Sequence, residues 1–282
     1  MTFKKIILSL SFVIAVFFGS AKELKYEHLF KGIDGTFVLY DLNKNEFNFY
    51  NRPKASTRIS PASTFKIPNA LIALETRIVT GPEHLMKWDG VKRTLKMHNR
   101  DHTLRTAMRD STVWYFQEIA RKVGPAGYRE YLKKLNYGNQ DISGGIDRFW
   151  LNTSLKISPL EQIEFLKNLY FEKIPFSKRS IDIVKDITCL YNTKDYQLHG
   201  KTGSDWDEKR GSVMGWFVGY VTKGKNVYLF AMNIEGKLPT FGGLFARELT
   251  EKILKSEGII DTVWNAPRTE DMIDPAFKVP KF

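Results

Sequence analysis

The chain has 282 residues, of which 43% are hydrophobic and 13% aromatic, and its formal net charge is +12. This length and hydrophobic content support a sizeable folded core and exclude a protein that is disordered throughout. Because the lysines and arginines are scattered among acidic residues, the charge indicates a solvated basic surface, and we expect no nucleic-acid partner. The single cysteine, Cys189, excludes an internal disulfide.

The N-terminus has the pattern of a secretory signal. Two lysines precede the apolar run IILSLSFVIAVFF, and the small residues GSA follow it. The run is too short to span a bilayer comfortably. We therefore predict a cleavable signal peptide over residues 1–21, with cleavage near Ala21, export to the periplasm, and no membrane association once the signal is removed. An uncleaved membrane anchor is the alternative.

Strands are predicted near both ends of the chain and helices between them. The segments TFVLYD and EFNFY predict one hairpin, and GSVMGWFVGYVT followed by VYLFAMNIE predicts another, which turns at Lys223-Gly224. The middle of the chain carries helical patterns, including DSTVWYFQEIARKVG and SPLEQIEFLKNLYF. A last helix is predicted for GLFARELTEKILKSEG.

This order of elements predicts an α+β fold. An antiparallel sheet, formed by residues of about 22–60 and 190–265, is expected to be flanked by N- and C-terminal helices, with a helical region inserted over about 61–190. We expect one catalytic domain over residues 22–265, with its site in a cleft between the two regions. Only the C-terminal tail, residues 266–282, has a composition typical of disorder.

The segment RISPASTFKIPNALIALET contains a serine and a lysine placed for nucleophilic catalysis. Ser60 suits the N-cap and Pro61 the first position of a helix, and apolar residues then recur at helical spacing. Ser63 and Lys66 would share one face of this helix, where the lysine amine can take the serine proton. The helix N-terminus would add backbone N–H groups beside the developing charge. Taken alone the pattern is weak, since an ordinary capped helix also produces it.

Two later segments add polar groups of the right kind. Ser111, in Ser111-Thr112-Val113, lies at the start of a predicted helix and can relay a proton to a leaving nitrogen; a plain N-cap is the alternative. Lys201-Thr202-Gly203 ends the predicted strand QLHGKTG, where it offers a cation, a hydroxyl and close access to the backbone. The order S-x-x-K, S-x-V, K-T-G is the order found in penicillin-recognising serine enzymes.

Together with YGN at 137–139, FWL at 149–151 and GWFVG at 215–219, these motifs resemble those of the class D, oxacillinase-type serine β-lactamases. The resemblance extends from about Lys22 to Ile260. It implies a β-lactamase/transpeptidase-like fold and a small-molecule β-lactam as the partner. It also implies that the β-lactam ring of penicillin-type antibiotics is hydrolysed through an acyl-enzyme on Ser63.

The resemblance further implies how Lys66 becomes a base. Burial would keep its amine neutral, and the family pattern places Phe65, Val113, Trp150 and Leu151 around it. The amine would then add CO2 or bicarbonate to become a carbamate held by the indole N–H of Trp150. Carbamylated Lys66 would be the general base for both acylation and deacylation. No diffusible cofactor and no metal are expected.

In the same family pattern, the backbone N–H groups of Ser63 and Ser204 are the expected oxyanion donors. Ser111 would pass a proton to the ring nitrogen, assisted by Lys201.

The substrate carboxylate is expected to meet Lys201, Thr202, Gly203 and an arginine of the last helix, for which Arg247 is the candidate. The arginine of several family members falls one position earlier, at Ala246. An exposed Arg247 paired with a glutamate one turn later is therefore the alternative.

Two other functions remain open at this point: a DD-peptidase, and a β-lactam sensor domain that stays acylated. Turnover of a chromogenic cephalosporin, with and without bicarbonate, separates them from a β-lactamase. His98 and His102 are spaced as metal ligands would be on a helix, but no third ligand is evident.

Overall fold

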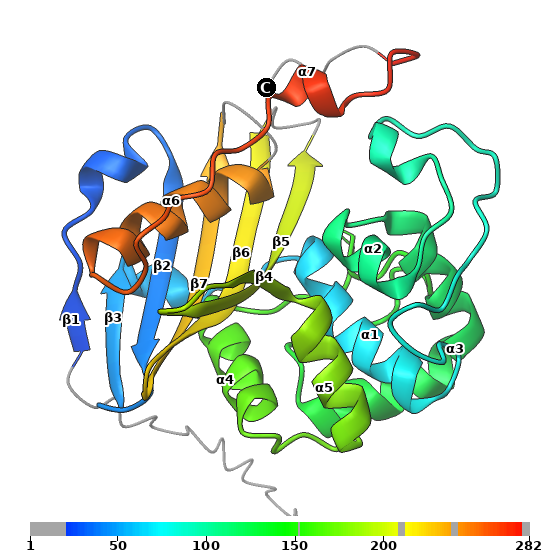
Figure 1. Ribbon diagram of the computed structural model, residues 1–282, viewed down its shortest axis with the longest axis horizontal. Helices are drawn as coiled ribbons and strands as arrows, with labels where there is room; N and C mark the ends of the chain where they lie inside the picture. Colours follow the sequence, from blue (N-terminus) through cyan, green and yellow to red (C-terminus); the bar gives the residue numbers. More distant parts are fainter. Residues whose placement is uncertain (1–20, 152, 208–211, 238–241, 278–282) are drawn as a thin grey trace, which may run out of the picture.

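The computed structural model describes residues 21–151, 153–207, 212–237 and 242–277. Two regions lie side by side: a twisted sheet covered on its outer face by helix α6, and a group of helices packed against the other face (Figure 1). This arrangement confirms the α+β class. The predicted signal peptide, apart from Ala21, lies outside the described residues.

The sheet has seven strands in the order β1-β3-β2-β7-β6-β5-β4. Their bounds are β1 Ala21–Glu23, β2 Asp34–Asp41, β3 Glu46–Tyr50, β4 Cys189–Asn192, β5 Gln197–Asp207, β6 Ser212–Lys223 and β7 Asn226–Gly236. Both predicted hairpins are confirmed, as β2–β3 and β6–β7, and both are antiparallel. The expected sheet is nevertheless not wholly antiparallel, because β1 pairs with β3 in parallel and makes the sheet mixed.

The helical region lies between β3 and β4 in the chain. Its α-helices are α1 Lys66–Glu75, α2 Leu104–Arg109, α3 Val113–Leu135, α4 Pro159–Tyr170 and α5 Lys178–Ile187, and its 3-10 turns are η2 Arg52–Ser56, η3 Ala62–Phe65 and η4 Lys96–His98. Helix α6, Gly242–Ser256, and the short α7, Thr269–Met272, follow the sheet. The expected N-terminal helix is reduced to the 3-10 turn η1, Glu27–Phe30.

The two faces of the sheet belong to different cores. Alternate residues of β6 point to opposite sides: Trp216 and Val218 pack with the helical region, whereas Phe217 packs with α6. The same alternation holds on β5, where Leu198 belongs to the α6 side. Lys201 of that strand bonds to Ser111 of the helical region, so it lies at the boundary between the two regions.

The described part of the C-terminal tail is packed, although its composition is typical of disorder. It runs back over α6 and across the end of the sheet to α7, beside the loop that carries η4 (Figure 1). Ile273 pairs with Leu95 of that loop and is 5% exposed. As far as residues 21–277 are described, no helix combines the length and apolar composition needed to cross a bilayer.

Candidate active site

Ser63 lies in the 3-10 turn η3 directly before α1, and Lys66 is the first residue of α1. Their side chains meet as the spacing predicts: Lys66 Nζ donates to Ser63 Oγ at 2.7 Å. In a 3-10 turn, side chains three residues apart are eclipsed, which brings the two closer than an α-helix would. The predicted cap is wrong in detail, since Ser60 Oγ donates instead to the carbonyl oxygen of Trp150 at 2.9 Å.

Neighbouring contacts hold this turn rigid. Thr64 Oγ1 donates to Pro61 O at 2.6 Å and accepts from Gln162 Nε2 at 3.0 Å. Trp216 Nε1, from the sheet, donates to Ser60 O at 2.8 Å. The nucleophile is therefore tied both to α4 and to the sheet, as a preorganised site requires.

The Lys66 amine lies in an aromatic environment. Its side chain is 1% exposed, and Nζ lies 5.4 Å from the centre of the Phe116 ring. Phe65, fully buried, stacks on Trp150 at 5.5 Å between ring centres. Burial, with a smaller contribution from the charge of Lys201, lowers the pKa of Lys66 well below its usual value. A neutral amine within reach of Ser63 can act as a base.

Trp150 has a buried polar atom without a partner. Among the described residues nothing bonds to its Nε1, although the side chain is fully buried. An unpaired buried N–H is costly and usually has a functional reason.

The motif at residues 137–139 holds the loop that follows Trp150. Asn139 Oδ1 accepts from Lys156 N at 2.8 Å, and its Nδ2 donates to Ser154 O at 2.8 Å. Gly138 has φ 54°, and a Cβ there would lie 2.0 Å from Lys156 O, so only glycine fits.

The second lysine comes from the sheet. Lys201 Nζ donates to Ser111 Oγ at 3.0 Å and to Thr202 O at 3.0 Å, and lies 3.4 Å from Thr202 Oγ1. Lys201 is 4% exposed, and burial, followed by the charge of Arg247, lowers its pKa to about 7. The structure thus joins the second and third motif segments directly, and the charge of Lys201 acts on the buried amine of Lys66 in the first.

Ser111 does not begin a helix. It lies in the turn between α2 and α3 with φ 57°, and Thr112 is the N-cap residue of α3. The alternative of a plain N-cap is therefore wrong, and the left-handed backbone aims the hydroxyl at Lys201 instead. Sequence reasoning missed this turn because serine seldom adopts a positive φ.

The strand β5 passes close to the nucleophile at Gly203. A Cβ at this position would lie 3.3 Å from Ser63 N and 3.1 Å from Pro61 O. Ser204 follows on β5, and its Oγ accepts from Gly243 N at 2.9 Å, which ties the strand to α6. The two expected oxyanion residues, Ser63 and Ser204, thus flank this close approach.

Arg247 is paired inside the protein. Its Nε donates to Glu251 Oε1 at 2.7 Å, and Glu251 is fully buried. Its guanidinium lies 4.2 Å from the ring centre of Trp264 in the C-terminal tail. The structure therefore favours the alternative of an ion-paired helix arginine, although half-buried rather than exposed, with Ala246 buried beside it.

Val113 and Leu151, the remaining residues expected around the Lys66 amine, lie at the start of α3 and directly after Trp150. Val113 opens α3 one turn before Phe116, and Leu151 follows Trp150 and packs partly against the same core. Phe116 was missed, although its position one helical turn after Val113 could have revealed it.

The two histidines each bond to a backbone carbonyl group. His98 Nε2 lies 3.0 Å from Asp110 O, and His102 Nε2 lies 2.9 Å from Met97 O. Among the described residues no three His, Cys, Asp or Glu side chains gather in a way that would hold a metal ion.

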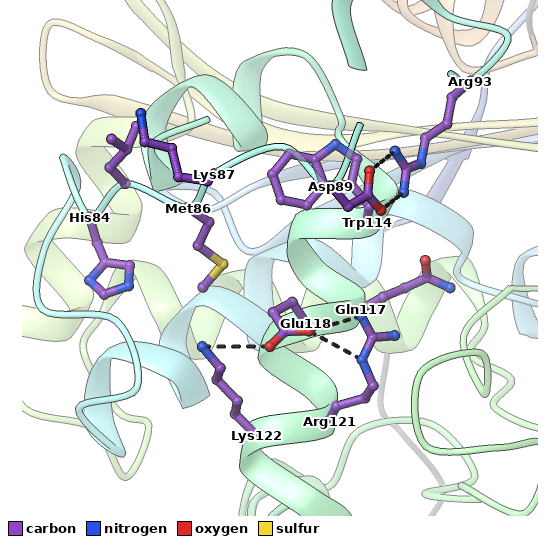
Figure 2. Close-up of a pocket in the computed structure, with 11 residues that line it drawn as sticks. His84, Met86, Lys87, Asp89, Arg93, Trp114, Gln117, Glu118, Arg121 and Lys122 are labelled. Atoms are coloured by element: carbon purple, nitrogen blue, oxygen red, sulfur yellow. Dashed lines mark hydrogen bonds and ion pairs between the residues drawn. The ribbon is translucent and has the colours of Figure 1, made fainter. Parts of the chain in front are cut away.

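A hollow of about 530 Å³ lies away from Ser63, between α3 and the loop at residues 84–93 (Figure 2). Most of its charged groups are paired with one another: Arg93 with Asp89, and both Arg121 and Lys122 with Glu118. Lys87 also lines the hollow and pairs with Asp101, which does not line it. Each of these six charged lining residues therefore already has a partner of opposite charge.

Comparison with known proteins agrees with this site. Residues 35–255 match the family described as the penicillin binding protein transpeptidase domain. The chain is 43% identical over 241 residues to the probable β-lactamase YbxI of Bacillus subtilis, covering 86% of this chain and 87% of that protein. It is also 43% identical over 235 residues to β-lactamase OXA-10 of Pseudomonas aeruginosa, covering 82% and 86%.

Solved structures are similar as well. A class D β-lactamase from Bacillus subtilis superposes with a TM-score of 0.79 at 43% identity, covering 85% of this chain and 98% of that chain. The C-terminal domain of the Bacillus licheniformis BlaR penicillin receptor superposes with a TM-score of 0.82 at 38% identity, covering 86% and 98%. The match in sequence, fold and motif order means that this chain belongs to the class D β-lactamase family.

Proposed function

We propose that the protein hydrolyses the β-lactam ring of penicillin-type antibiotics through an acyl-enzyme on Ser63. The observation that carries this proposal is the contact of Ser63 Oγ with a buried amine, Lys66 Nζ, at 2.7 Å. Burial lowers the pKa of that amine well below its usual value and so favours the neutral, basic form, which an exposed lysine does not adopt near pH 7. The nearby Lys201–Ser111 pair supplies the acid that the leaving nitrogen needs.

Lys66 is also suited to carry a carbamate formed from CO2 or bicarbonate. Its neutral amine can add CO2, and the buried Nε1 of Trp150, without a partner among the described residues, is a donor suited to hold the new oxygens. When bound, this group supplies a carboxylate-type general base for both acylation and deacylation.

Acylation begins when Ser63 Oγ loses its proton to the Lys66 side chain and attacks the lactam carbonyl carbon. The backbone N–H groups of Ser63 and Ser204 would donate to the developing oxyanion. The carbon–nitrogen bond then breaks, and the nitrogen takes its proton from Ser111 Oγ, to which Lys201 Nζ donates. Thr202 and Lys201 would meet the substrate carboxylate, and Arg247 would add positive potential from behind β5.

Deacylation requires a water molecule to attack the ester carbonyl while Ser63 Oγ recovers its proton. This step separates hydrolysis from permanent acylation, so it is the step to measure. We expect many turnovers of a chromogenic cephalosporin per enzyme, faster with bicarbonate than after its removal. Mass spectrometry after brief exposure to a penicillin should show an adduct on Ser63 that disappears within the time of turnover.

A β-lactam sensor is the second candidate, because the BlaR receptor domain superposes closely on this chain. A sensor would give one stoichiometric burst and an adduct that persists. A DD-peptidase would release D-alanine from a peptide ending in D-alanyl-D-alanine. Either result would replace the proposed hydrolysis.

Export to the periplasm with removal of residues 1–21 is part of the proposal. It rests on the two lysines, apolar run and small residues of the N-terminus. N-terminal sequencing of the protein recovered from the periplasm should begin at or next to Lys22, and a chain that retains Met1 would contradict it.

A further inference from the structure

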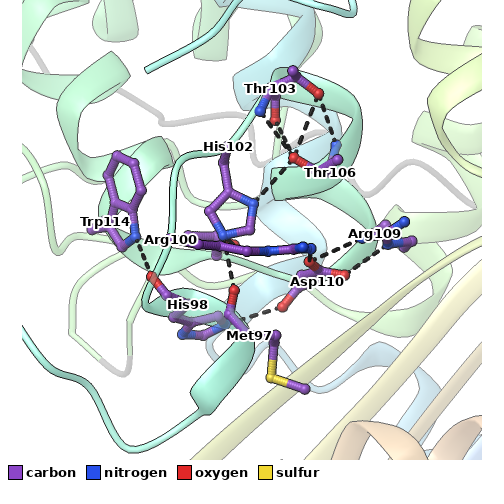
Figure 3. Close-up of polar contacts among 10 residues, drawn as sticks. Met97, His98, Arg100, His102, Thr103, Thr106, Arg109, Asp110 and Trp114 are labelled. Atoms are coloured by element: carbon purple, nitrogen blue, oxygen red, sulfur yellow. Dashed lines mark hydrogen bonds and ion pairs between the residues drawn. The ribbon is translucent and has the colours of Figure 1, made fainter. Parts of the chain in front are cut away.

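A second polar cluster contacts the residues on either side of Ser111, and the proposed mechanism assigns it no role. It contains His98, His102, Arg100, Arg109 and Asp110, which come from the loop before α2 and from the end of α2 (Figure 3). Its members bond to the residues immediately before and after Ser111.

Ser111 needs such support because its backbone is strained. Its φ of 57° lies in the left-handed region, which a serine adopts only when surrounding contacts hold it there. The neighbouring backbone supplies part of this support, with Thr112 N donating to Ala107 O at 2.9 Å.

His98 holds both sides of this turn. Its Nε2 lies 3.0 Å from the carbonyl oxygen of Asp110, the residue before Ser111, and its own carbonyl accepts from Trp114 Nε1 at 2.9 Å. The side chain is 5% exposed, and burial lowers the pKa of His98 to about 4. The ring is therefore neutral near pH 7, and as the Nε2–H tautomer it donates to Asp110 O.

The carboxylate of Asp110 is fixed from the opposite side. Arg100 Nη2 lies 2.6 Å from its Oδ2, and Arg109 Nε lies 2.7 Å from its Oδ1. His102 Nε2 lies 3.2 Å from Thr112 Oγ1, the residue after Ser111. Each of the three consecutive residues of the turn, Asp110, Ser111 and Thr112, therefore has a polar contact with another side chain.

The C-terminal tail holds the loop that carries His98. Asn99 Nδ2 donates to Asp274 Oδ2 at 3.0 Å, and Asp274 N donates to Thr94 O at 2.7 Å. Ile273 pairs with Leu95 three residues before His98. This tail lies beyond residue 255, where the match to the transpeptidase family ends.

We propose that His98 is a positioning residue for Ser111, acting through the Asp110 carbonyl, and that the C-terminal tail holds His98 in place by binding Leu95 and Asn99. The proposal rests on the role proposed above for Ser111, proton delivery to the leaving nitrogen. A displaced Ser111 slows the breaking of the carbon–nitrogen bond. The rate should fall most for substrates whose leaving nitrogen is basic and must be protonated as the bond breaks.

The test compares two substrates with His98→Phe, which keeps a ring of similar shape but removes the donor. Benzylpenicillin expels a basic nitrogen, whereas the nitrogen of a chromogenic cephalosporin is conjugated and leaves more readily. We expect kcat/KM to fall about tenfold for benzylpenicillin and less than about threefold for the cephalosporin. His98→Gln, whose amide can reach Asp110 O, should restore most of the loss.

Ser111→Ala is the reference, and His84→Phe is the matched control, because, within the described part of the chain, the ring of His84 bonds to Thr80 and not to the turn at Ser111. If Ser111→Ala fails to distinguish the two substrates, the proposed role of Ser111 is wrong. If Ser111→Ala distinguishes them and His98→Phe behaves like His84→Phe, the positioning role is overturned. Should His98→Phe not fold, His98→Asn, with an amide too short to reach Asp110 O, decides in the same way.

The contribution of the tail is tested in the full chain with Asp274→Ala and Asn99→Ala. Both should show the same preference for the cephalosporin, with a loss of about threefold for benzylpenicillin. Combined with His98→Phe, they should add little, because they act through that residue. Parental kinetics in both variants would remove the tail from the proposal and leave His98 to stand alone.

Discussion

The two buried lysines of the site come from different regions, and their surroundings differ accordingly. Lys66 belongs to the helical region, with one hydrogen bond to Ser63 and an aromatic ring beside its amine. Lys201 belongs to the sheet and lies within 3.4 Å of three oxygen atoms of Ser111 and Thr202. Both are almost fully buried, at 1% and 4% exposure, so burial alone does not distinguish them.

The neighbouring charges of the two amines differ as well. The pKa of Lys66 falls well below its usual value, chiefly through burial and further through the charge of Lys201. The pKa of Lys201 falls to about 7, through burial and then the charge of Arg247. Lys201 therefore still binds a proton for part of the time near neutral pH. The proposed mechanism uses the first amine as base and the second as acid, in keeping with these different environments.

The largest effect is expected from Lys66→Ala, which removes the base from the helical side. Since the proposed mechanism uses this amine in both acylation and deacylation, kcat/KM for benzylpenicillin should fall by about 10⁴-fold. Stopped-flow kinetics and mass spectrometry should also detect no rapid adduct on Ser63. A variant that acylates at the parental rate would show that Lys66 is not the base.

Trp150→Phe tests the proposed carbamate on Lys66, in the helical region. The variant keeps a ring to stack on Phe65 but removes the indole N–H, so it should hold the carbamate less firmly. We expect the acyl-enzyme to accumulate and its hydrolysis to slow by about 100-fold, with acylation less affected.

Carbon-13 NMR in labelled bicarbonate checks the cause of that effect. The parent should show a carbamate signal that Trp150→Phe weakens. If the parent shows no such signal while hydrolysing penicillin at full rate, the carbamate is absent from the mechanism.

The dependence of kcat/KM on pH tests the proposed role of Lys201, the lysine on the sheet. Lys201 supplies a proton or a positive charge only when protonated, and its pKa in the free enzyme is about 7. As pH rises through this value the protonated fraction falls, so kcat/KM should decrease by about tenfold per pH unit above it. Lys201→Arg should move this alkaline limb to higher pH, because arginine stays protonated. An unmoved limb would assign the titration to another group.

Arg247 gives the smallest expected effect on catalysis. Arg247→Leu should lower the free energy of unfolding by about 3 kcal/mol, because Glu251 stays buried without its cation. The double variant Arg247→Leu/Glu251→Leu should recover most of that stability in denaturant titrations. In the double variant, KM for benzylpenicillin should rise no more than about threefold. A rise of tenfold or more would mean that the guanidinium touches the substrate carboxylate.

Several features of this protein follow from the sequence alone. The hairpins, the main helices and the pairing of Ser63 with Lys66 all depend on residues close together in the chain, where spacing and turn chemistry decide the geometry. The order of the three motifs also identified the family, and the comparisons confirm it.

Other features depend on contacts between distant segments. Four features belong to this group: the parallel pairing of β1, the left-handed turn at Ser111, the packing of Arg247 on Trp264, and the packing of the tail on the loop before His98. The conformational preferences of the local residues disfavour some of these features and do not determine the others. Residue spacing along the chain therefore could not predict them. Only the tertiary structure decided them, because the energy that offsets a strained turn or a buried charge comes from partners far away in sequence.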